Sequence, residues 1–139
     1  MIQPSPLNVA LLQSELHWES VEENVKMVEK KVEHLPENVD LIVLPEMFST
    51  GFTMNPSGVA EANAGVAMSR LKDLSSKKGF AICGSFVAEE NGKYFNRFFW
   101  ISEGKLEYTY DKRHLFRMAK ENDVYSQGTG DVRIKFKGW

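Results

Sequence analysis

Three charged side chains of this 139-residue chain, Glu46, Lys112 and Glu121, could take part in chemistry. Carboxylates and amines are groups that enzymes use to move protons and to stabilise developing charge. Glu46 follows the apolar run Val39–Leu44, and open α/β sheets place their sites at the carboxyl ends of strands. Its position alone is equally typical of the first solvated residue after a strand.

Lys112 and Glu121 are less informative when each is taken singly. Lys112 lies in the segment Tyr110–Phe116 (YDKRHLF), directly after a predicted strand, where a lysine is usually a surface charge. Leu115 and Phe116 fit a hydrophobic core as well as a pocket wall. Glu121 alone is typical of an exposed acid near a helix end. Only the combination of the three charged residues points to a site.

A strand, a helix and a second strand are expected at the start of the chain. Leu7–Gln13 is apolar with β-branched content and indicates a buried strand. Ser20 and Glu23 have the spacing of a capping box, and the continuous run Val39–Leu44 indicates a strand covered on both faces. Between them lies one apolar helix stripe that Pro36 ends. The stripe consists of Val21, Val25, Val28, Val32 and Leu35.

The middle of the chain predicts a long loop, a second helix and a third strand. Residues 48–63 are rich in Gly, Ser, Thr, Asn and Pro and indicate a loop. A second helix, which ends near Gly79, is indicated by apolar residues at helical spacing: Ala64, Ala67, Leu71 and Leu74. Phe80–Val87 is again apolar and predicts a buried strand.

The pattern then changes to strands joined by tight turns. Asn91-Gly92 is a hairpin signal before a strand over Tyr94–Ile101, and Glu103-Gly104 is a second turn. Alternating apolar residues predict two further strands: Leu106, Tyr108 and Tyr110, then Val132, Ile134 and Phe136. The order βαβαβ followed by a meander predicts a single α/β domain with a mixed sheet and helices on at least one face.

Taken together and in this order, the motifs resemble the nitrilase superfamily of carbon–nitrogen hydrolases. The matching features are a strand that ends in LPEMF, a strand–hairpin–strand, YDKRHLF, and a glutamate nine residues after the lysine. The resemblance covers Leu7–Trp139 and implies part of a four-layer α-β-β-α sandwich. STGFTMNP and KRHLFRMAKE are similar to the omega-amidase branch, which hydrolyses the terminal amide of 2-oxo acids such as 2-oxoglutaramate.

The resemblance also implies a Glu–Lys–Cys site. Glu46 would be the general base that takes the thiol proton and later activates water. Lys112 would stabilise the tetrahedral oxyanion, and Glu121 would orient the lysine and the substrate. The nucleophile would lie in a Cys-Tyr-Asp-like elbow beyond Trp139. Residues 1–139 are then a truncated single domain that is expected to be inactive alone.

Further expectations concern the pocket and its partners. Phe48, Phe52 and Phe116 are expected to contact the substrate, a small-molecule amide. The resemblance implies a homodimer or higher homo-oligomer and no cofactor.

Cys83 is not expected to be the nucleophile. It lies inside the apolar run Ala81–Gly84, where a free cysteine behaves as a small buried hydrophobe. Burial without a cationic partner raises the pKa of a thiol and makes it inert. A structural role is therefore expected, although Gly84 and Ser85 could widen access to the sulfur.

Proton transfer from a thiol to a carboxylate needs a special environment. With ordinary pKa values of about 8.5 for Cys and about 4.3 for Glu, the transfer is uphill by roughly 5.7 kcal/mol. Burial raises the pKa of a carboxyl, and an adjacent ammonium lowers the pKa of a thiol. The implied chemistry therefore predicts a dry pocket.

Composition argues against several classes of function. The formal net charge of -2 provides no basic field for nucleic acid or an anionic membrane. No apolar run reaches the ~20 residues of a membrane span, and the first residues do not form a secretory signal. A single cysteine suits a reducing compartment, so a cytoplasmic protein is expected. The three histidines are isolated, so no metal site is predicted.

Two other interpretations stay open. Metal-dependent phosphodiesterases of the endonuclease/exonuclease/phosphatase type also use a glutamate just after a buried strand, as a magnesium ligand. They explain neither Lys112 nor the segment YDKRHLF. The chain could also be an inactive piece that folds or pairs with its other half.

Overall fold

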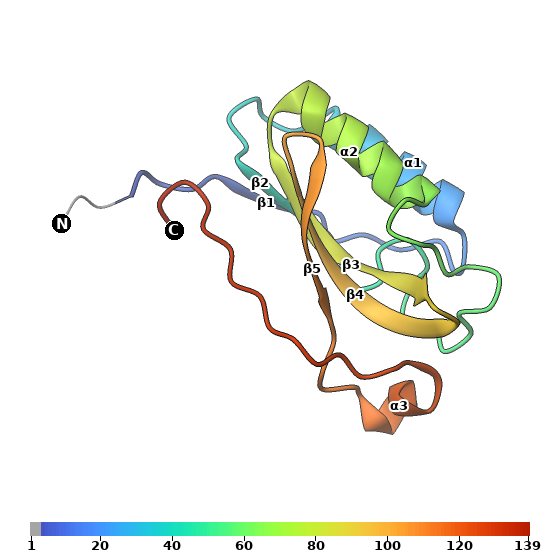
Figure 1. Ribbon diagram of the computed structural model, residues 1–139. Coiled ribbons are helices and arrows are strands. Elements are labelled where there is room, and N and C mark those ends of the chain that lie inside the picture. The colour runs from blue at the N-terminus through green and yellow to red at the C-terminus, as the bar shows by residue number, and fades with distance from the viewer. Residues whose placement is uncertain (1–3) are drawn as a thin grey trace.

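The computed structural model describes residues 4–139, which form one five-stranded mixed sheet with two helices on one face (Figure 1). The strands lie side by side in chain order: β1 (Val9–Leu11), β2 (Leu41–Val43), β3 (Ala81–Glu90), β4 (Lys93–Ser102) and β5 (Lys105–Asp111). The first three are parallel, and β3, β4 and β5 are joined as antiparallel hairpins. The predicted mixed α/β sheet is confirmed, and its sheet and helices form two adjacent layers.

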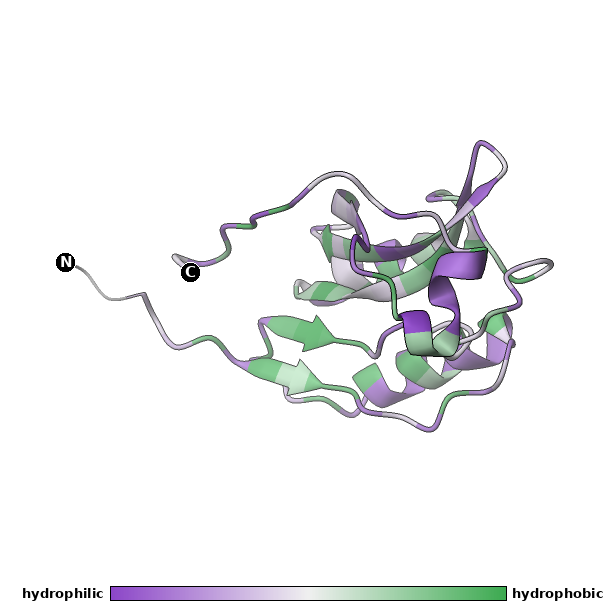
Figure 2. Cartoon of the chain, turned by 90° about the horizontal axis from the view of Figure 1, so that it is seen from below, coloured by the Kyte–Doolittle hydropathy of each residue, from purple (hydrophilic) through white to green (hydrophobic). Residues whose placement is uncertain are grey.

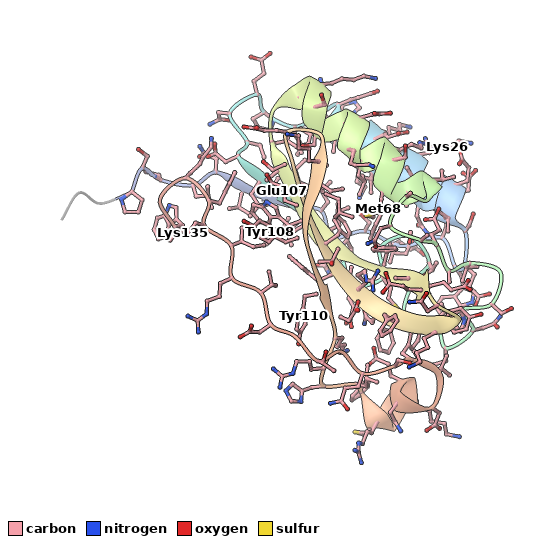
Figure 3. All side chains as sticks on the ribbon, viewed as in Figure 1. Lys26, Met68, Glu107, Tyr108, Tyr110 and Lys135 are labelled. Carbon is pink, nitrogen blue, oxygen red and sulfur yellow. The ribbon has the colours of Figure 1, made fainter. Side chains whose placement is uncertain are left out.

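Helices α1 (Val21–Val32) and α2 (Val66–Lys78) cover one face of the sheet and enclose the main core. Figure 3 shows Met68 of α2 between its helix and the sheet, whereas Lys26 of α1 points to solvent. The fully buried residues of this core come from both layers: Val25, Leu71, Ile42, Phe86 and Phe99. The apolar helix faces therefore lie where their periodicity predicts. Within residues 4–139, no helix has the length and apolar character needed to cross a bilayer.

The first two strands are shorter and less buried than predicted. β1 covers three residues rather than Leu7–Gln13, and Val9 and Leu11 are 45% and 74% exposed. Within residues 4–139, β1 pairs only with β2, so its outer edge has no partner strand. Ile42 of β2 is buried beneath the helices, but its two neighbours in the strand are only half-buried. The prediction of full burial is therefore wrong on the face that lies away from the helices.

Helix α1 begins at the predicted place but without the predicted capping box. Ser20 is the N-cap residue, yet no side-chain hydrogen bond caps the helix. Buried Asn24 in the first turn makes the anchoring contacts instead. Its side chain accepts the His17 N–H at 2.8 Å and donates to the carbonyl oxygens of His17 and Ser49 at 2.7 and 2.9 Å. The helix start is thereby tied to the loop that follows β2.

The predicted strand over Val132–Phe136 is wrong. Residues 126–139 run as an irregular segment along the sheet, on the side opposite the helices (Figure 1). Ile134 and Phe136 pack there against a buried cluster that includes Trp100, and the Trp100 and Phe136 rings meet edge to face at 5.1 Å. Figure 3 shows Tyr108 and Tyr110 of β5 on this same side. The apolar alternation is satisfied by contact with a sheet face rather than by strand pairing.

Between β5 and this segment lie a 3₁₀ turn (Arg117–Ala119) and the short helix α3 (Glu121–Val124). Figure 2 shows hydrophobic residues along β1 and β2 and mostly hydrophilic residues at α3. Gly128 then brings the chain back against the end of β5, where its N–H donates to the Lys112 carbonyl at 3.1 Å. A Cβ atom on Gly128 would lie 2.0 Å from the carbonyl oxygen of Asp111. The close approach of the two backbones therefore requires glycine.

We expect Gly128→Ala to lower the free energy of unfolding by about 2 kcal/mol, because the added methyl group forces the two backbones apart. Urea unfolding followed by circular dichroism measures this loss. Gly130→Ala is the matched control, since a Cβ atom there meets nothing within 4 Å. Equal stability of the two variants would show that the contact with Asp111 is not a constraint.

Candidate active site

Glu46 lies just beyond β2, in a turn that β3 fixes. The Met47 N–H donates to the Ser85 hydroxyl at 2.8 Å, and the Phe48 N–H donates to the Ser85 carbonyl at 3.0 Å. Met47 has a φ of 48°, so the chain turns sharply after the glutamate. These contacts place the Glu46 side chain at the carboxyl end of the parallel strands, where α/β folds build their sites.

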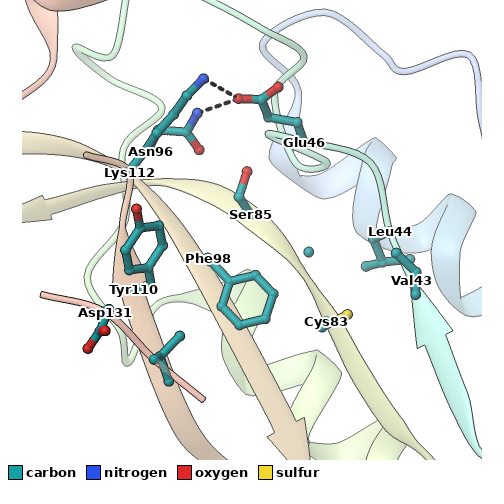
Figure 4. A pocket seen from close by; sticks show the side chains of 12 residues that line it. Val43, Leu44, Glu46, Cys83, Ser85, Asn96, Phe98, Tyr110, Lys112 and Asp131 are labelled. Atoms are coloured by element: carbon teal, nitrogen blue, oxygen red, sulfur yellow. Dashed lines mark hydrogen bonds and ion pairs between the residues drawn. The ribbon is translucent and has the colours of Figure 1, made fainter. Parts of the chain in front are cut away.

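Lys112 follows β5 and is held through its backbone on both sides. Its N–H donates to the Asn96 carbonyl at 3.0 Å, and its own carbonyl accepts the Gly128 N–H. The ammonium lies 2.9 Å from Glu46 Oε1 (Figure 4) and 3.0 Å from Glu121 Oε2. The acid after the second strand and the lysine after the hairpin therefore meet, as expected.

Glu121 begins α3, and its side chain is fully buried. Oε2 accepts the Phe116 N–H at 2.6 Å in addition to the Lys112 ammonium, and Oε1 accepts the Asn96 amide at 3.0 Å. A carboxylate can be buried only when it is paired in this way. The alternative interpretation of Glu121 as an exposed helix-end acid is wrong.

Asn96 belongs to the site, although its sequence context alone did not single it out. It lies on β4 and is 2% exposed. Its amide nitrogen donates to Glu46 at 2.7 Å and to Glu121 at 3.0 Å, so each of its two hydrogens serves one carboxylate. The available signal was an asparagine inside a largely aromatic strand, because a buried amide must find hydrogen-bond partners.

A second buried polar group, Arg97, fixes the end of β5, the strand that Lys112 follows. It lies on β4 directly opposite Asp111 of β5 and binds that carboxylate through two nitrogens, at 2.6 and 2.9 Å. Asn63 and Glu90 accept from the same guanidinium at 3.0 and 3.2 Å. Such a bidentate pair fixes geometry as well as contributing energy. The β4–β5 register is thereby locked one residue before the lysine.

Hydrogen bonds and ion pairs within the site together have a larger effect than burial on the pKa values of Glu121 and Lys112. Burial raises the pKa of the Glu121 carboxyl, but hydrogen bonds from Phe116, Asn96 and Lys112 together leave that pKa below its ordinary value. Burial lowers the pKa of the Lys112 ammonium, but its pairs with Glu46 and Glu121 raise that pKa above its ordinary value. Lys112 is therefore a fixed cation and Glu121 a fixed anion at neutral pH.

A second hydrophobic cluster joins the loop after β2 to helix α3. Its buried members are Met47, Val87 and Tyr125. The Tyr125 hydroxyl donates to the Thr53 carbonyl at 2.6 Å. Because Met47 follows the first glutamate and Tyr125 follows α3, this cluster sets the distance between the two carboxylates.

A cavity of about 600 Å³ opens beside these groups, on the sheet face that lies away from the helices. Figure 4 shows Glu46, Asn96 and Lys112 together at one end and Cys83 beyond Ser85 along its wall. Apolar side chains such as Val43, Leu44 and Phe98 form much of the lining. The Glu46 side chain is 51% exposed, so residues 4–139 do not enclose the dry pocket that the chemistry requires.

Cys83 lines the same cavity but is poorly suited to attack. It is 8% exposed, and burial raises the pKa of its thiol to about 11. The sulfur therefore carries its proton at neutral pH, and the thiol rather than the nucleophilic thiolate is present. This agrees with the expected structural role.

The three predicted substrate contacts lie in different environments. Phe48 is fully buried in the main core, edge to face with Phe99 at 5.7 Å, and does not line the cavity. Phe116 is 50% exposed and also lies outside the lining; its backbone N–H, not its ring, serves the site. The core holds the Phe48 ring and the turn holds the Phe116 ring outside this cavity, and substrate contact by these two residues stays a prediction. Phe52 is half-buried, with Lys112 Nζ 5.5 Å from its ring centroid.

The sequence matches the family profile described as Carbon-nitrogen hydrolase over residues 8–136. The chain belongs to the carbon–nitrogen hydrolase family. Membership agrees with the fold, the strand-end glutamate and the lysine after the hairpin. It also supports the predicted nitrilase superfamily and its omega-amidase-like branch.

The relatives of this chain include proteins named as amidases. It is 33% identical to "Omega-amidase YafV" of Escherichia coli K12 over 133 residues, 96% of this chain and 51% of the relative. It is 29% identical to "2-oxoglutaramate amidase" of Bacillus subtilis, covering 94% and 51%. The crystal structure of XC1258, a CN-hydrolase superfamily protein from Xanthomonas campestris, superposes with a TM-score of 0.90 at 32% identity, covering 96% and 50%. The chain thus spans about half the length of these relatives.

We expect Asn96→Asp to lower the free energy of unfolding by about 1–3 kcal/mol at pH 7, because a third carboxylate replaces the donor shared by two others. Crowded carboxylates raise the pKa of one member, so the folded state binds a proton more readily than the unfolded chain. The loss is therefore largest at neutral pH and shrinks as the pH falls through that raised pKa. Urea unfolding at several pH values measures it.

Asn38→Asp is the control for this change, because Asn38 is exposed and gains the same charge. We expect it to cost less than about 0.5 kcal/mol at every pH. If the two variants behaved alike, Asn96 would not bridge the carboxylates.

Proposed function

We propose that this chain supplies the acid, the lysine and the second glutamate of an amidase that converts a small linear amide into a carboxylic acid and ammonia. The observation that carries the proposal is the Lys112 ammonium, held between Glu46 and Glu121 at one end of the cavity. General acid–base catalysis and oxyanion stabilisation need such a pair on preorganised elements.

In the proposed reaction Glu46 takes the proton of a cysteine thiol, and the sulfur attacks the amide carbon. The carbonyl oxygen becomes an oxyanion, which Lys112 stabilises. The protonated Glu46 then gives its proton to the amide nitrogen, and ammonia leaves as the thioester forms. Glu46 next takes a proton from water, whose oxygen attacks the thioester; the acid leaves and the thiol regains its proton. Glu121 holds the Lys112 ammonium in place throughout.

The nucleophile in this proposal is a cysteine beyond residue 139, because Cys83 lies beyond Ser85 from Glu46, the base that would take its proton (Figure 4). Burial also raises the pKa of the Cys83 thiol to about 11, which makes that proton harder to remove. The 139 residues are then the first part of one domain. The length comparison supports this, since the relatives are about twice as long. We propose that the complete protein is a homodimer or higher homo-oligomer, requires no cofactor and acts in the cytoplasm.

The proposed substrate is the terminal amide of a 2-oxo acid such as 2-oxoglutaramate. Its support is the similarity to proteins named omega-amidase and 2-oxoglutaramate amidase. The metal-dependent phosphodiesterase is not favoured, because the ammonium of Lys112 already lies between the two carboxylates that would have to bind a magnesium ion.

We expect the 139-residue chain alone to release no ammonia from 2-oxoglutaramate, because its sole thiol, that of Cys83, lies apart from Glu46 and has its pKa raised to about 11 by burial. Coupled detection of ammonia measures this. Turnover that Cys83→Ala abolishes would contradict the prediction and assign the nucleophile to Cys83.

A chimera tests the proposed roles in a complete enzyme. Residues 1–139 replace the matching half of E. coli omega-amidase YafV, which supplies the remaining half. We expect the chimera to hydrolyse 2-oxoglutaramate and Glu46→Gln to lower its kcat by about 10²–10⁴-fold, because the general base is lost.

Glu37→Gln is the matched control, since Glu37 is an exposed acid outside the cavity, and we expect its kcat to stay within about twofold. Unfolding temperatures of the three chimeras show that all are folded. A Glu46→Gln chimera as active as the control would overturn the proposed role of Glu46.

A further inference from the structure

A small second cavity, separate from the one beside Glu46, lies on the loop between β5 and the irregular segment. Its volume is about 180 Å³. The lining residues are Arg113, His114, Leu115, Arg117, Asn122 and Gln127. All but Leu115 can donate hydrogen bonds, and no carboxylate is among them.

The two arginines of this cavity lack the acidic partners that Arg70 and Arg97 have. Arg70 is paired with Glu22 and Glu29, and Arg97 with Asp111 and Glu90. Within residues 4–139, neither Arg113 nor Arg117 forms an ion pair. The positive charge is a local feature, because the whole chain carries a net charge of -2.

The acids near the cavity in sequence are directed elsewhere, and Asp111, two residues before Arg113, is paired with Arg97. The carboxylate of Asp123 accepts the side-chain amide of Asn122 at 3.0 Å, and Asp123 does not line the cavity. Glu121, on the other side of Asn122, is occupied by Lys112, Asn96 and the Phe116 N–H. None of the three acids pairs with the guanidinium groups of Arg113 and Arg117.

The cavity walls are fixed by contacts that also build the candidate active site. The Gly128 N–H bond to the Lys112 carbonyl brings the neighbouring residues Gln127 and Arg113 together. In the same way, the Phe116 N–H bond to the Glu121 carboxylate brings Arg117 close to Asn122. The donors therefore converge before any ligand arrives, which lowers the entropic cost of binding.

We propose that this cavity binds a small oxyanion, either a phosphate group or a carboxylate. Arginine presents planar donors that match both groups. The volume is below the roughly 300–1,000 Å³ of pockets for drug-sized ligands, which fits an ion or the anionic end of a longer molecule. The site is independent of the proposed amidase reaction, since no catalytic residue lines it.

Titration of the ¹⁵N-labelled 139-residue chain tests the proposal, with inorganic phosphate in one arm and succinate in the other. Sodium chloride keeps the ionic strength constant. We expect saturable shifts of the Arg113 and Arg117 side-chain signals and of amides in residues 113–127 in at least one arm. The tighter arm identifies the ligand class.

Substitutions distinguish a built site from general attraction of anions. We expect Arg113→Gln and Arg117→Gln each to weaken binding by about tenfold or more, because a charge-assisted hydrogen bond is lost. Arg133→Gln is the matched control, because it removes the same charge from an exposed residue that lies outside the cavity. We expect this substitution to change the affinity by less than twofold.

The variants at Arg113, Arg117 and Arg133 can be compared as folded proteins, because all three side chains are exposed, and the amide spectrum of each variant reports its folding. Arg113→Lys keeps the charge and removes the planar donor, so it should bind more weakly than the unmodified chain. Shifts that do not saturate in either arm, or an equal loss in Arg133→Gln, would overturn the proposal.

Discussion

One ammonium group, Nζ of Lys112, holds two carboxylates together at the end of the sheet. Glu46 reaches it from the end of β2 and Glu121 from the start of α3, at 2.9 and 3.0 Å. Without this cation the two acids would repel each other, and a wholly buried Glu121 could not stay ionised. The Asn96 amide adds one hydrogen bond to each acid. Four separate chain segments therefore meet through one group of charges, and that group fixes the loops that carry them.

A cluster of charges can hold a geometry only if its supports are rigid, and here each support is tied to the sheet. The Arg97–Asp111 pair locks β4 to β5 just before the lysine. The Ser85 hydroxyl fixes the turn after Glu46 through the Met47 N–H. A catalytic group must stay within a fraction of an ångström of its productive position, and strands provide this better than free loops do. Buried polar contacts in the sheet are therefore part of the site, although Arg97 and Asp111 do not line the cavity.

Local patterns in the sequence predicted the helices, the hairpins and the strand-end glutamate, because each depends on periodicity or turn chemistry within a short window. These local patterns gave wrong predictions where contacts with residues distant in the sequence determine the structure. Val132–Phe136 alternates like a strand, but a sheet face rather than a neighbouring strand satisfies its apolar side chains. In place of the capping box, Asn24 makes hydrogen bonds to His17, before the helix, and to Ser49, in the loop after β2. Asn96 and Glu121 likewise became meaningful only when the fold brought their carboxylate and amide groups together, and Phe48 proved to belong to the core.

The apolar lining of the cavity would exclude water from Glu46 if the sheet face that lies away from the helices were covered further. A thiol proton moves to a carboxylate against roughly 5.7 kcal/mol at ordinary pKa values, so the reaction needs a poorly hydrated site. The Glu46 side chain is 51% exposed, whereas Val43, Phe98 and Cys83 provide an apolar wall beside it. Lys112 and Glu121 are already charged and paired, so further cover would mainly dehydrate Glu46 and the thiol. The polar end of the cavity is thus preorganised, and shielding of one carboxylate is the step that its chemistry still requires.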